Sequence, residues 1–583
     1  MSSTSAKRRP QRVCASGVWC SGCGGGGGSG SRRVRSANRA LVGGTAYAEA
    51  REARRKQKEL QLERRLQKPG QDRVHQLKKY WEKLRRRDQS KEKQSELVGE
   101  TIELMGDDFA EFIFKHDASR IVQSCLKHGT AAQRIKIAEG LKGHFVELAK
   151  SKYGQFIVIK ILNYCPKMRE AILKEFQGKV RALIRHKQAS SVVEELFSQY
   201  ANAEQRAALV VEFFGREFVL FKNAGQGKTL TEILEKDPQK RESILKHLFE
   251  TLNNTLTKGT MNHSIVHRAL LEYLTHADAN GITNITGLVG EQAVEILHTK
   301  DGAQAVMLML AHAGPKERKV MVRSFKPYVL KICKEEFGHM VMLRMFDVVD
   351  DTVMVRKLVL SAIVQNLPEL AEDRYGHRVL LYLLVGRKPR YFFKQTLDLL
   401  AAGDEIRAKT SKKDPALRAG ELLEGVSAEM ISQVAEHAEM VRGSYGSQLV
   451  MEIMLQAKGD KTKAVEALVE LAGQEPSAEQ EGESEEHVLR HSVASRVYKT
   501  LVQLDKDGSI GFAQKLLDTV RGSLLQHATN NGGFVVLALL ENPLTQADAR
   551  KELKAAKKKL TAAAKENPQQ KGLQLLVEKL KSA

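Results

Sequence analysis

Basic side chains flanked by tyrosines recur along this 583-residue chain, at similar places in a repeated pattern. The residues of this kind are Lys152, Tyr153, Lys160, Arg185, Lys187, Arg374, Tyr375, Arg378 and Tyr445. Lysine and arginine neutralise backbone phosphates without reading sequence, and a tyrosine ring can stack on a base. The pattern therefore indicates binding to nucleic acid. Packing of the tyrosines between repeats is the alternative interpretation.

Patterns that would indicate an enzyme or a metal centre are incomplete. The segment Gly225-Gln226-Gly227-Lys228-Thr229 is similar to a phosphate-binding loop, but the glycine that should open the loop is absent and no strand precedes it. Cys20 and Cys23 lack a second cysteine pair, and His263 and His267 lack a third ligand. We therefore expect no catalytic residue, no cofactor and no metal, and we predict that the protein is not an enzyme.

The charge of the chain is positive and unevenly distributed. Lysine and arginine total 93 against 70 aspartates and glutamates, a net charge of +23. Residues 1–100 hold 25 basic and 10 acidic side chains, so +15 of this excess lies there. Such an excess attracts polyanions. Six scattered cysteines exclude a disulfide-dense secreted fold, and no 18-residue apolar run could form a transmembrane helix, so we expect no membrane partner.

Residues 1–96 are predicted to form a basic arm. The first 48 residues contain no acid and include the run Gly24–Gly28, a composition typical of disorder, and helix-forming residues follow from Ala48. The functional interpretation is nuclear or nucleolar targeting, and a solvated tail is the alternative. Because the start lacks acids and contains serine and arginine, an organellar transit peptide stays open as well.

A repeat positions the basic and aromatic residues. Self-comparison aligns a series of small residues, which we call the ladder: Ala118, Gly154, Ala189, Gly215, Asn262, Gly302, Gly338, Gly376, Gly446, Ala494 and Gly532. Most steps are 35 to 48 residues long, as in helical solenoids, whereas steps of 26 and 70 depart from this range. Amphipathic helical stretches lie between the ladder residues, and one repeat cannot close its own core. We predict an all-α, right-handed helical solenoid of about eleven three-helix repeats, with each small residue permitting close packing.

Changes in composition suggest boundaries within the array. The longest step leaves room for an inserted helical segment around residues 391–430. Residues 473–486 contain six glutamates and no basic residue, which predicts a disordered acidic loop. We expect a first set of repeats over residues 97–390, a second set over 391–545, and a Lys/Ala-rich helical tail over 546–583.

Several stretches resemble the pumilio (PUF) family, and in particular its nucleolar Puf-A or PUF–CPL branch. They are Tyr80–Arg86, Ala118–Gln123, Glu217–Phe218 with Leu220–Lys222, Glu336–His339 with Phe346–Val353, Tyr375–Leu384, and Ser411–Asp414 with Arg418–Leu423. The resemblance covers roughly residues 78–545. It implies PUF-like repeats over 97–390 and a CPL-like segment over 391–545.

The same resemblance implies a function. We expect an RNA-binding protein of the nucleus and nucleolus that acts in biogenesis of the large ribosomal subunit or in pre-rRNA processing, and some relatives repress translation of messenger RNA. The implied partners are pre-rRNA or messenger RNA, with DNA as a further candidate, and proteins of the pre-ribosomal particle. Outside that particle we expect a monomer. A protein scaffold of the HEAT or armadillo kind without RNA contact is the alternative function.

In PUF proteins two side chains of each repeat contact a base edge and a third stacks on bases. Ser119, Arg120 and Gln123 match this set, and by comparison with the family the serine and glutamine suggest adenine. A second complete set is Ser190, Ser191 and Glu194. Ser495 and Arg496 belong to a partial set, because Lys499 cannot accept a hydrogen bond.

The other repeats contain apolar residues at edge positions, including those that begin with Gln155 and His377. A base-by-base readout along the whole array is therefore not expected, and contacts with backbone phosphates should dominate. For Ser119 and Gln123 the alternative is an ordinary polar face of a helix.

Overall fold

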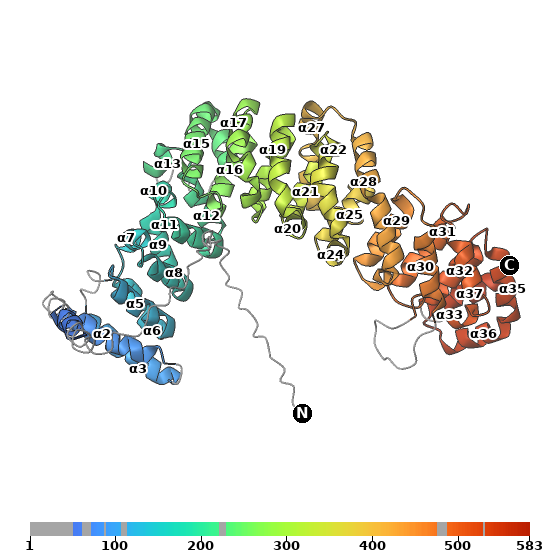
Figure 1. The fold of residues 1–583 in the computed structure, drawn as a ribbon, viewed down its shortest axis with the longest axis horizontal. Coiled ribbons are helices and arrows are strands. Elements are labelled where there is room, and N and C mark those ends of the chain that lie inside the picture. The colour runs from blue at the N-terminus through green and yellow to red at the C-terminus, as the bar shows by residue number, and fades with distance from the viewer. Residues whose placement is uncertain are drawn as a thin grey trace, which may run out of the picture. The chain divides into compact units, whose positions relative to one another are not determined.

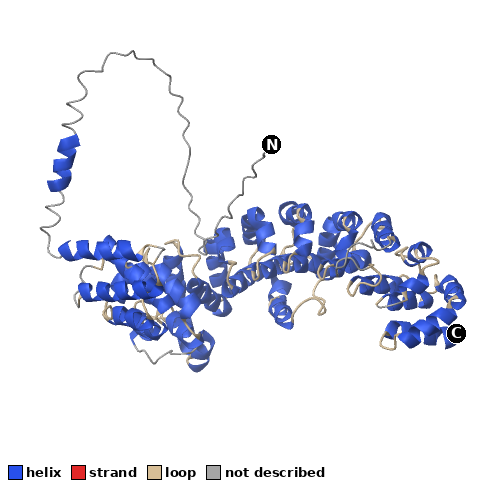
Figure 2. Cartoon of the chain, turned by 90° about the horizontal axis from the view of Figure 1, so that it is seen from below, coloured by secondary structure: helices blue, strands red, loops and turns tan. Residues whose placement is uncertain are grey.

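The computed structural model describes residues 51–60, 71–86, 89–106, 113–220, 229–474, 487–528 and 531–582. All regular secondary structure in these residues is helical, as Figure 2 shows. Contacts divide the chain into two units, residues 1–75 and residues 76–583. In the first unit, residues 51–60 are helical and carry exposed ion pairs such as Arg55 with Glu59. The expected all-α fold class is confirmed.

In the second unit one row of helices, which we call the central row, continues along the array, with neighbouring helices in contact directly or, at one step, through the turn Leu196–Tyr200. Its members are α5 (His116–His128), α8 (Gln155–Tyr164), α11 (Ala189–Glu195), α16 (Ser264–His276), α18 (Lys300–His312), α21 (Gly338–Val348), α25 (Gly376–Val385), α29 (Gly446–Gln456), α31 (Ala494–Leu504), α34 (Gly532–Glu541) and α37 (Lys571–Ser582). Figure 1 shows them in chain order. Except for Gly215, every ladder residue lies within two residues of the start of one of these helices.

The remaining helices complete the repeats. They are α6 (Ala131–Glu139), α7 (Phe145–Lys150), α9 (Arg169–Phe176), α10 (Val180–Ile184), α12 (Ala203–Val211), α13 (Arg216–Leu220), α14 (Leu230–Lys236), α15 (Arg241–Leu256), α17 (Ala279–Val289), α19 (Pro315–Phe325), α20 (Val329–Cys333), α22 (Thr352–Val355), α23 (Ser361–Gln365), α24 (Leu367–Glu372), α28 (Pro415–Glu436), α30 (Thr462–Gly473), α32 (Ala513–Thr519), α33 (Leu524–His527), α35 (Gln546–Ala555) and α36 (Lys557–Glu566). In the repeat of α6, α7 and α8, the apolar residues Ile137, Leu148 and Ile161 are fully buried. Helical spacing therefore directs apolar side chains into a shared core, as the sequence predicts.

Close packing explains the glycines of the ladder. A Cβ atom at Gly154 would lie 2.8 Å from the carbonyl oxygen of Leu148, and one at Gly376 would lie 2.8 Å from that of Leu370. Both carbonyls belong to the short helix that precedes the central-row helix. Only a residue without a side chain lets the two helices approach this closely.

Three boundaries differ from the sequence prediction. The arm predicted over residues 1–96 contains α2 (Gln71–Leu84) and the start of α3 (Lys91–Met105). Both helices pack on the array: Leu77 and Leu84 are buried, and α3 contacts α5. The expected tail 546–583 is a folded repeat, because α37 packs on α34 and buries Leu573 and Leu576. Composition, in which lysine is prominent in these segments, does not by itself reveal the apolar faces of the helices.

The third difference concerns Gly215. The helix that follows it, α13, does not join the central row among the described residues. Instead the row passes from α11 through the π-helical turn Leu196–Tyr200 to α16. The short ladder step at this point therefore marks a place where two repeats merge. Most of the predicted acidic loop, residues 475–486, lies outside the described residues.

Carboxylates of one repeat cap the short helix of the preceding repeat. Glu175 accepts hydrogen bonds from the backbone N–H groups of Gly143 (2.6 Å) and Phe145 (3.0 Å). Equivalent pairs join Glu212 to Gly178 and Val180, and Glu552 to Gly522 and Leu524. Each carboxylate satisfies N–H groups that a helix N-terminus leaves without partners.

Basic side chains cap the opposite helix ends. Arg134, Arg169, Arg206, Arg318 and Lys461 each donate to a carbonyl oxygen at the end of the helix that lies seven to nine residues earlier. These donors stabilise the negative end of the helix dipole. Part of the positive charge of the chain is therefore used inside the fold.

The predicted insertion folds as α26 (Lys394–Ala401) and α27 (Asp404–Thr410), followed by the long helix α28. Helix α27 contacts α18 and α21, and its label stands near that of α21 in Figure 1. The buried Arg318 of α19 donates to both the hydroxyl (2.8 Å) and the carbonyl oxygen (3.3 Å) of Thr410. The inserted segment thus returns to earlier repeats and joins them to α28.

A buried arginine at the start of α28 completes this connection. Arg418, whose side chain is 2% exposed, forms an ion pair with Asp350 (2.7 Å) and donates to the carbonyl oxygens of Asp347 and Lys413. Asp350 also accepts from Ser411 and from the backbone of Lys412. Although burial acts to raise the pKa of Asp350, the hydrogen bonds from Ser411 and Arg418 hold it down to about 2. We call this group the Arg418–Asp350 clasp.

We expect the substitution Asp350→Asn to loosen α27 and α28. It leaves the Arg418 guanidinium buried without its charged partner, so the free energy of local opening should fall by about 2 kcal/mol. Hydrogen exchange of the amides of α28 at pH 7 measures this change.

The pH dependence of thermal stability is a second measurement of the contribution of the Arg418–Asp350 clasp. Because the pKa of Asp350 in the folded protein lies below its usual value of 3.8, the ion pair contributes fully above about pH 4 and is lost as the pH falls toward 2. The difference in thermal midpoint between parent and Asp350→Asn should disappear over that range. Asp351→Asn is the matched control, because Asp351 is exposed and its capping bond to the N–H of Met354 survives in asparagine. Equal effects of the two substitutions would show that the clasp adds no stability.

Candidate nucleic-acid interface

The residues predicted to contact RNA lie on five helices of the central row, or just before the start of these helices. They lie in or just before α5, α8 and α11, which are neighbours, and in or just before α25 and α31, further along the row. The ladder residues bring each first turn to an equivalent place. The structure therefore arranges the predicted residues in two groups.

The set on α5 is only partly available to a ligand. Ser119 is fully buried, and its hydroxyl donates to the carbonyl oxygen of Tyr153 (2.9 Å). The amide of Gln123 donates to the Ser119 hydroxyl (3.1 Å). Ser119 therefore has no exposed atom for a base edge, and it joins α5 to the next repeat instead.

Arg120, the third member of this set, is exposed. Its guanidinium lies 5.8 Å from the ring centroid of Trp81, and that of Arg85 lies 4.8 Å from the same ring. The indole N–H of Trp81 donates to Ser124 (2.9 Å), which fixes the ring beside α5. The sequence analysis placed Trp81 and Arg85 in the arm, so it missed that they share a surface with Arg120.

At α8 the aromatic residue packs between repeats and the cations lie around it. The rings of Tyr153 and His116 meet edge to face with centroids 4.7 Å apart, and the exposed Lys152 lies over Tyr153 at 5.6 Å. Gln155 donates to the carbonyl oxygen of Lys152 (3.0 Å). Tyr153 thus contacts the neighbouring repeat, as the alternative interpretation expected, and Lys152 keeps a free ammonium group.

Lys160 lies in a cationic neighbourhood. Burial and then the charge of Lys127 lower the pKa of Lys160. The pKa of His128 is likewise lowered by burial and by Lys127, Lys160 and Arg134. Positive charges that lower one another's pKa values form a region that a phosphate would stabilise.

The second predicted reading set, on α11, is mostly used inside the protein. Glu194 accepts from the backbone N–H (2.8 Å) and the hydroxyl of Ser264, and so caps α16 at the point where the central row skips a repeat. Burial raises the pKa of Glu194, opposed by the bonds from Ser264. Ser190 is buried, whereas Ser191 is exposed. Glu194 is therefore a connector between α11 and α16.

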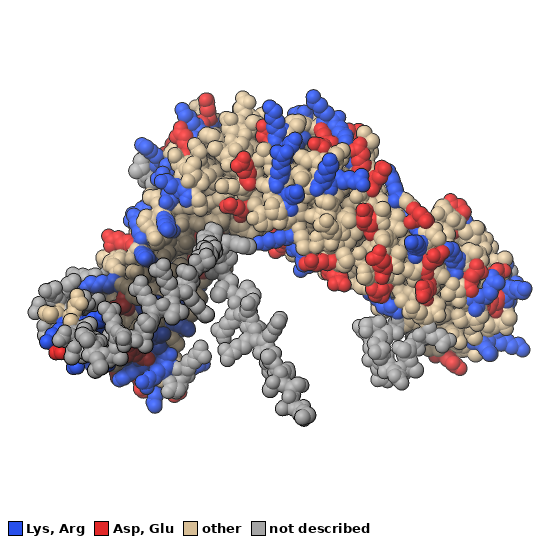
Figure 3. All heavy atoms as spheres, in the orientation of Figure 1, with Lys and Arg blue, Asp and Glu red and all other residues tan. Residues whose placement is uncertain are grey.

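A cationic cluster that the sequence analysis missed lies next to α11. Arg181 contacts the ring nitrogen of His247 (2.8 Å), and its pKa is lowered by burial and by the charges of Arg185 and Arg216. Arg185 and Lys187, both predicted, are exposed here. Figure 3 shows basic side chains gathered over α10 and α13, which carry Arg181 and Arg216. These residues come from three different repeats, so no local sequence pattern could group them.

At α25 aromatic rings stack between repeats. Tyr375 stacks on His339 (centroids 5.1 Å apart) and His377 stacks on Tyr445 (4.2 Å). His377 is buried, and burial lowers its pKa, so it is neutral at pH 7 and offers no charge to a phosphate. The tyrosines here also contact neighbouring repeats.

Two arginines accompany the rings at α25. Arg374 is exposed and lies 5.5 Å from the Tyr375 ring centroid. Arg378 lies between two rings, 5.8 Å from Tyr375 and 4.9 Å from Phe393, a phenylalanine that is 64% exposed. Burial and the charge of Arg374 lower the pKa of Arg378.

At α31, Ser495 is buried and Arg496 is exposed. Arg496 lines a cavity of about 290 Å³ together with Arg390, Tyr391 and Gln448. The sequence analysis did not select these last three residues, because two of them come from the inserted segment.

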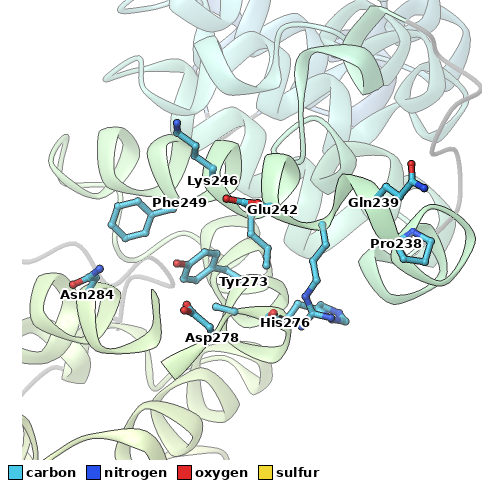
Figure 4. Close-up of a pocket in the computed structure, with 12 residues that line it drawn as sticks. Pro238, Gln239, Glu242, Lys246, Phe249, Tyr273, His276, Asp278 and Asn284 are labelled. Atoms are coloured by element: carbon cyan, nitrogen blue, oxygen red, sulfur yellow. Dashed lines mark hydrogen bonds between the residues drawn. The ribbon is translucent and has the colours of Figure 1, made fainter. Parts of the chain in front are cut away.

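A second cavity, of about 650 Å³, lies between α15, α16 and α17, and Figure 4 shows its lining. Leu245, Phe249 and Tyr273 provide apolar surface, and the rings of Phe249 and Tyr273 lie 5.8 Å apart. Charged residues of both signs surround it, including Lys246 and Glu242. None of the predicted contact residues lines this cavity, and it has no excess of positive charge to attract a phosphate backbone.

The structure also locates two of the incomplete patterns. His267 is buried, and its ring nitrogens contact the hydroxyl of Thr299 and the carbonyl oxygen of Met261, both at 2.7 Å. Thr229 caps α14, whereas residues 225–228 and the pair Cys20 and Cys23 lie outside the described residues. Within the part of the chain that the structure describes, no three potential ligands gather for a metal ion, and every helix is too short or too polar to span a membrane.

Comparison with known proteins matches both halves of the array. Residues 118–141 and 144–176 match the Pumilio-family RNA binding repeat, and residues 372–509 match the CPL (NUC119) domain. The Schizosaccharomyces pombe protein "Pumilio homology domain family member 6" is 36% identical over 86% of this chain and 79% of its own length.

Two solved structures are similar over the array. The crystal structure of human Puf-A has a TM-score of 0.81 at 33% identity, covering 87% of this chain and all of that chain. The crystal structure of human Puf-A in complex with DNA has a TM-score of 0.80 at 33% identity, covering 88% of this chain and all of that chain.

The α5 set yields a prediction that separates its members. Ser119→Ala removes a buried hydrogen bond, so it should lower stability by about 1 kcal/mol and leave base preference unchanged. Arg120→Ala removes an exposed cation and should weaken RNA binding by about 1 to 3 kcal/mol. Titration of both variants against RNAs that differ at one nucleotide, at fixed salt, measures this. A changed base preference in Ser119→Ala would mean that α5 rearranges to expose the serine when RNA binds.

Proposed function

The chain belongs to the pumilio family, in the group of PUF-repeat proteins that carry a CPL domain, and from this premise we propose that it binds single-stranded RNA mainly through backbone phosphates. Support comes from how the central row divides its residues. The base-edge candidates Ser119, Ser190, His377 and Ser495 are buried, and Glu194 caps α16. The basic residues beside them are exposed: Arg120, Lys152, Arg185, Lys187, Arg374 and Arg496.

This division between buried base-edge candidates and exposed basic residues favours binding affinity over selection of a particular base sequence. Exposed lysine and arginine contact phosphates of any sequence, whereas buried hydroxyls cannot hydrogen-bond a base. The similar human Puf-A was crystallised in complex with DNA. Binding that depends on phosphates accommodates both nucleic acids, so we infer that DNA is a second ligand of this chain.

We further propose that the protein acts in the nucleolus, in biogenesis of the large ribosomal subunit or processing of its RNA, and that it contacts proteins of that particle. The resemblance to the nucleolar PUF–CPL branch and the +15 excess of residues 1–100 support this role. A basic arm is retained where polyanions are concentrated. Regulation of messenger RNA translation is a further role that the same RNA-binding surface would serve.

Salt dependence tests the phosphate contacts. If about six phosphates are neutralised, the plot of log K against log salt for single-stranded RNA should have a slope near −4. The triple variant Lys152→Ala, Arg185→Ala, Lys187→Ala should make this slope shallower by about 2.

The control for this test removes the same charge elsewhere. Lys316, Lys319 and Arg323 are exposed on α19, which is not part of the central row, and their triple alanine variant should keep the parental slope. No RNA binding by the parent would instead favour a protein scaffold. A strong preference for one RNA sequence would contradict phosphate-dominated binding.

Deletion of the basic arm tests the location. Because α2 packs on the array, the deletion should end at residue 70 rather than at residue 96. Removing residues 1–70 should release the protein from nucleoli, and residues 1–70 fused to a fluorescent reporter should carry the reporter there. Retention of the truncated protein in nucleoli would show that the array contains the targeting signal. Delivery of a reporter by residues 1–48 to another organelle would identify a transit peptide.

A further inference from the structure

The cavity beside α31 is built by the inserted segment as well as by the central row. Residues 386–393 follow α25 directly and supply Arg390 and Tyr391 to its wall. Helix α29 contributes Gln448 and Met451, and α31 contributes Arg496. The volume is about 290 Å³. It is therefore a small site between two consecutive helices of the central row.

The wall of the cavity is held in place by several bonds. Arg387 forms ion pairs with Asp347 and Asp404, both at 2.6 Å. Lys388 (2.7 Å) and the hydroxyl of Tyr391 (2.6 Å) both contact the buried carboxylate of Glu452 on α29. These contacts fix the segment on both sides of Arg390, so the site exists before any ligand binds.

The groups that face the cavity are suited to one nucleotide. Tyr391 offers an aromatic ring and Met451 a polarisable apolar surface, which together suit a flat base. Arg390 and Arg496 are exposed, and the Arg390 guanidinium lies 5.6 Å from the centroid of the Tyr391 ring. Neither side chain is held in an ion pair among the described residues, so both guanidinium groups suit the phosphates on either side of a base.

Gln448 adds a directional group. Its amide N–H donates to the carbonyl oxygen of Ser444 (3.1 Å), so its own carbonyl oxygen stays available as an acceptor. Gln448 stands two residues after the ladder residue Gly446, the same position that Arg120 and Arg496 occupy relative to theirs. An acceptor at this place hydrogen-bonds the exocyclic amino group of a base and disfavours a carbonyl.

We propose that this cavity binds one unstacked base of the single strand, with the base against Tyr391 and Met451 and its amino group donating to Gln448. Arg390 and Arg496 bind the flanking phosphates. This inference rests on the proposed RNA binding and adds to it one position at which base identity matters. Cytosine, with its amino group, is favoured over uracil, which has a carbonyl at the same place.

The test compares oligocytidylate and oligouridylate 12-mers, which differ only in that group. At fixed salt the full chain should bind oligocytidylate about fivefold more tightly, the effect of one hydrogen bond. Gln448→Ala should remove the preference, whereas Gln292→Ala, at an exposed glutamine away from the cavity, should keep it. Tyr391→Ala should weaken the binding of both RNAs by about fivefold or more, and Tyr391→Phe, which keeps the ring, should weaken binding much less.

The arginines provide a readout that does not depend on packing. The double variant Arg390→Ala, Arg496→Ala should make the salt slope shallower by about 1.4, compared with no change for Lys319→Ala, Arg323→Ala. Two results would contradict the proposed base site without contradicting phosphate binding. The first is equal affinity of the parent for both 12-mers, and the second is a preference for oligocytidylate that remains in Gln448→Ala. Absence of RNA binding by the parent would overturn both.

Discussion

Helix ends in this array lack hydrogen-bond partners within the helix, and in several of the described repeats a charged side chain of the next repeat supplies them. Glu175 and Glu212 satisfy backbone N–H groups of short helices, and Arg169 and Arg318 satisfy carbonyl oxygens of central-row helices. Because these caps come from a neighbour, the repeats that receive them are incomplete alone, both in their core and at these helix ends. Stacking of repeats therefore supplies core packing and helix caps together, and it fixes the positions of the central-row helices.

The same chemistry divides the positive charge of the chain between two uses. Arginines that cap helices already donate to carbonyl oxygens, and of those named above only Arg206 is also exposed. Lys152, Arg185 and Arg496, by contrast, precede or begin central-row helices and remain exposed. Net charge alone cannot distinguish these uses, since Arg169 and Arg185 belong to the same residue type within one repeat. The distinction appears only when each donor is followed to its acceptor.

The dependence of each repeat on its neighbours explains how much of the fold and of the candidate site the sequence could predict. The spacing of small residues identified the central row, because close helix packing demands them at Gly154 and Gly376. It failed at Gly215, where the row passes from α11 to α16 through a π-helical turn, and it did not extend to α37, whose apolar stripe lies in a Lys-rich segment. Residue type predicts contact residues around α5 and α11, and this prediction stays open. Residue type does not reveal burial or internal bonds, and in the structure Ser119 and Glu194 bond to neighbouring repeats.

The inserted segment between α25 and α28 is bonded to the central row through buried and half-buried arginines. Two stretches that carry the family resemblance, one ending at Val353 and one beginning at Ser411, meet in the Arg418–Asp350 clasp. The clasp holds α28 against α21, and Arg387 holds the start of the insertion against the same helix through Asp347. That anchoring positions Tyr391 and Arg390 beside α29 and α31. The inserted segment is thus bonded to the central row on both sides of Arg390, and these bonds hold the wall of the 290 Å³ cavity in place.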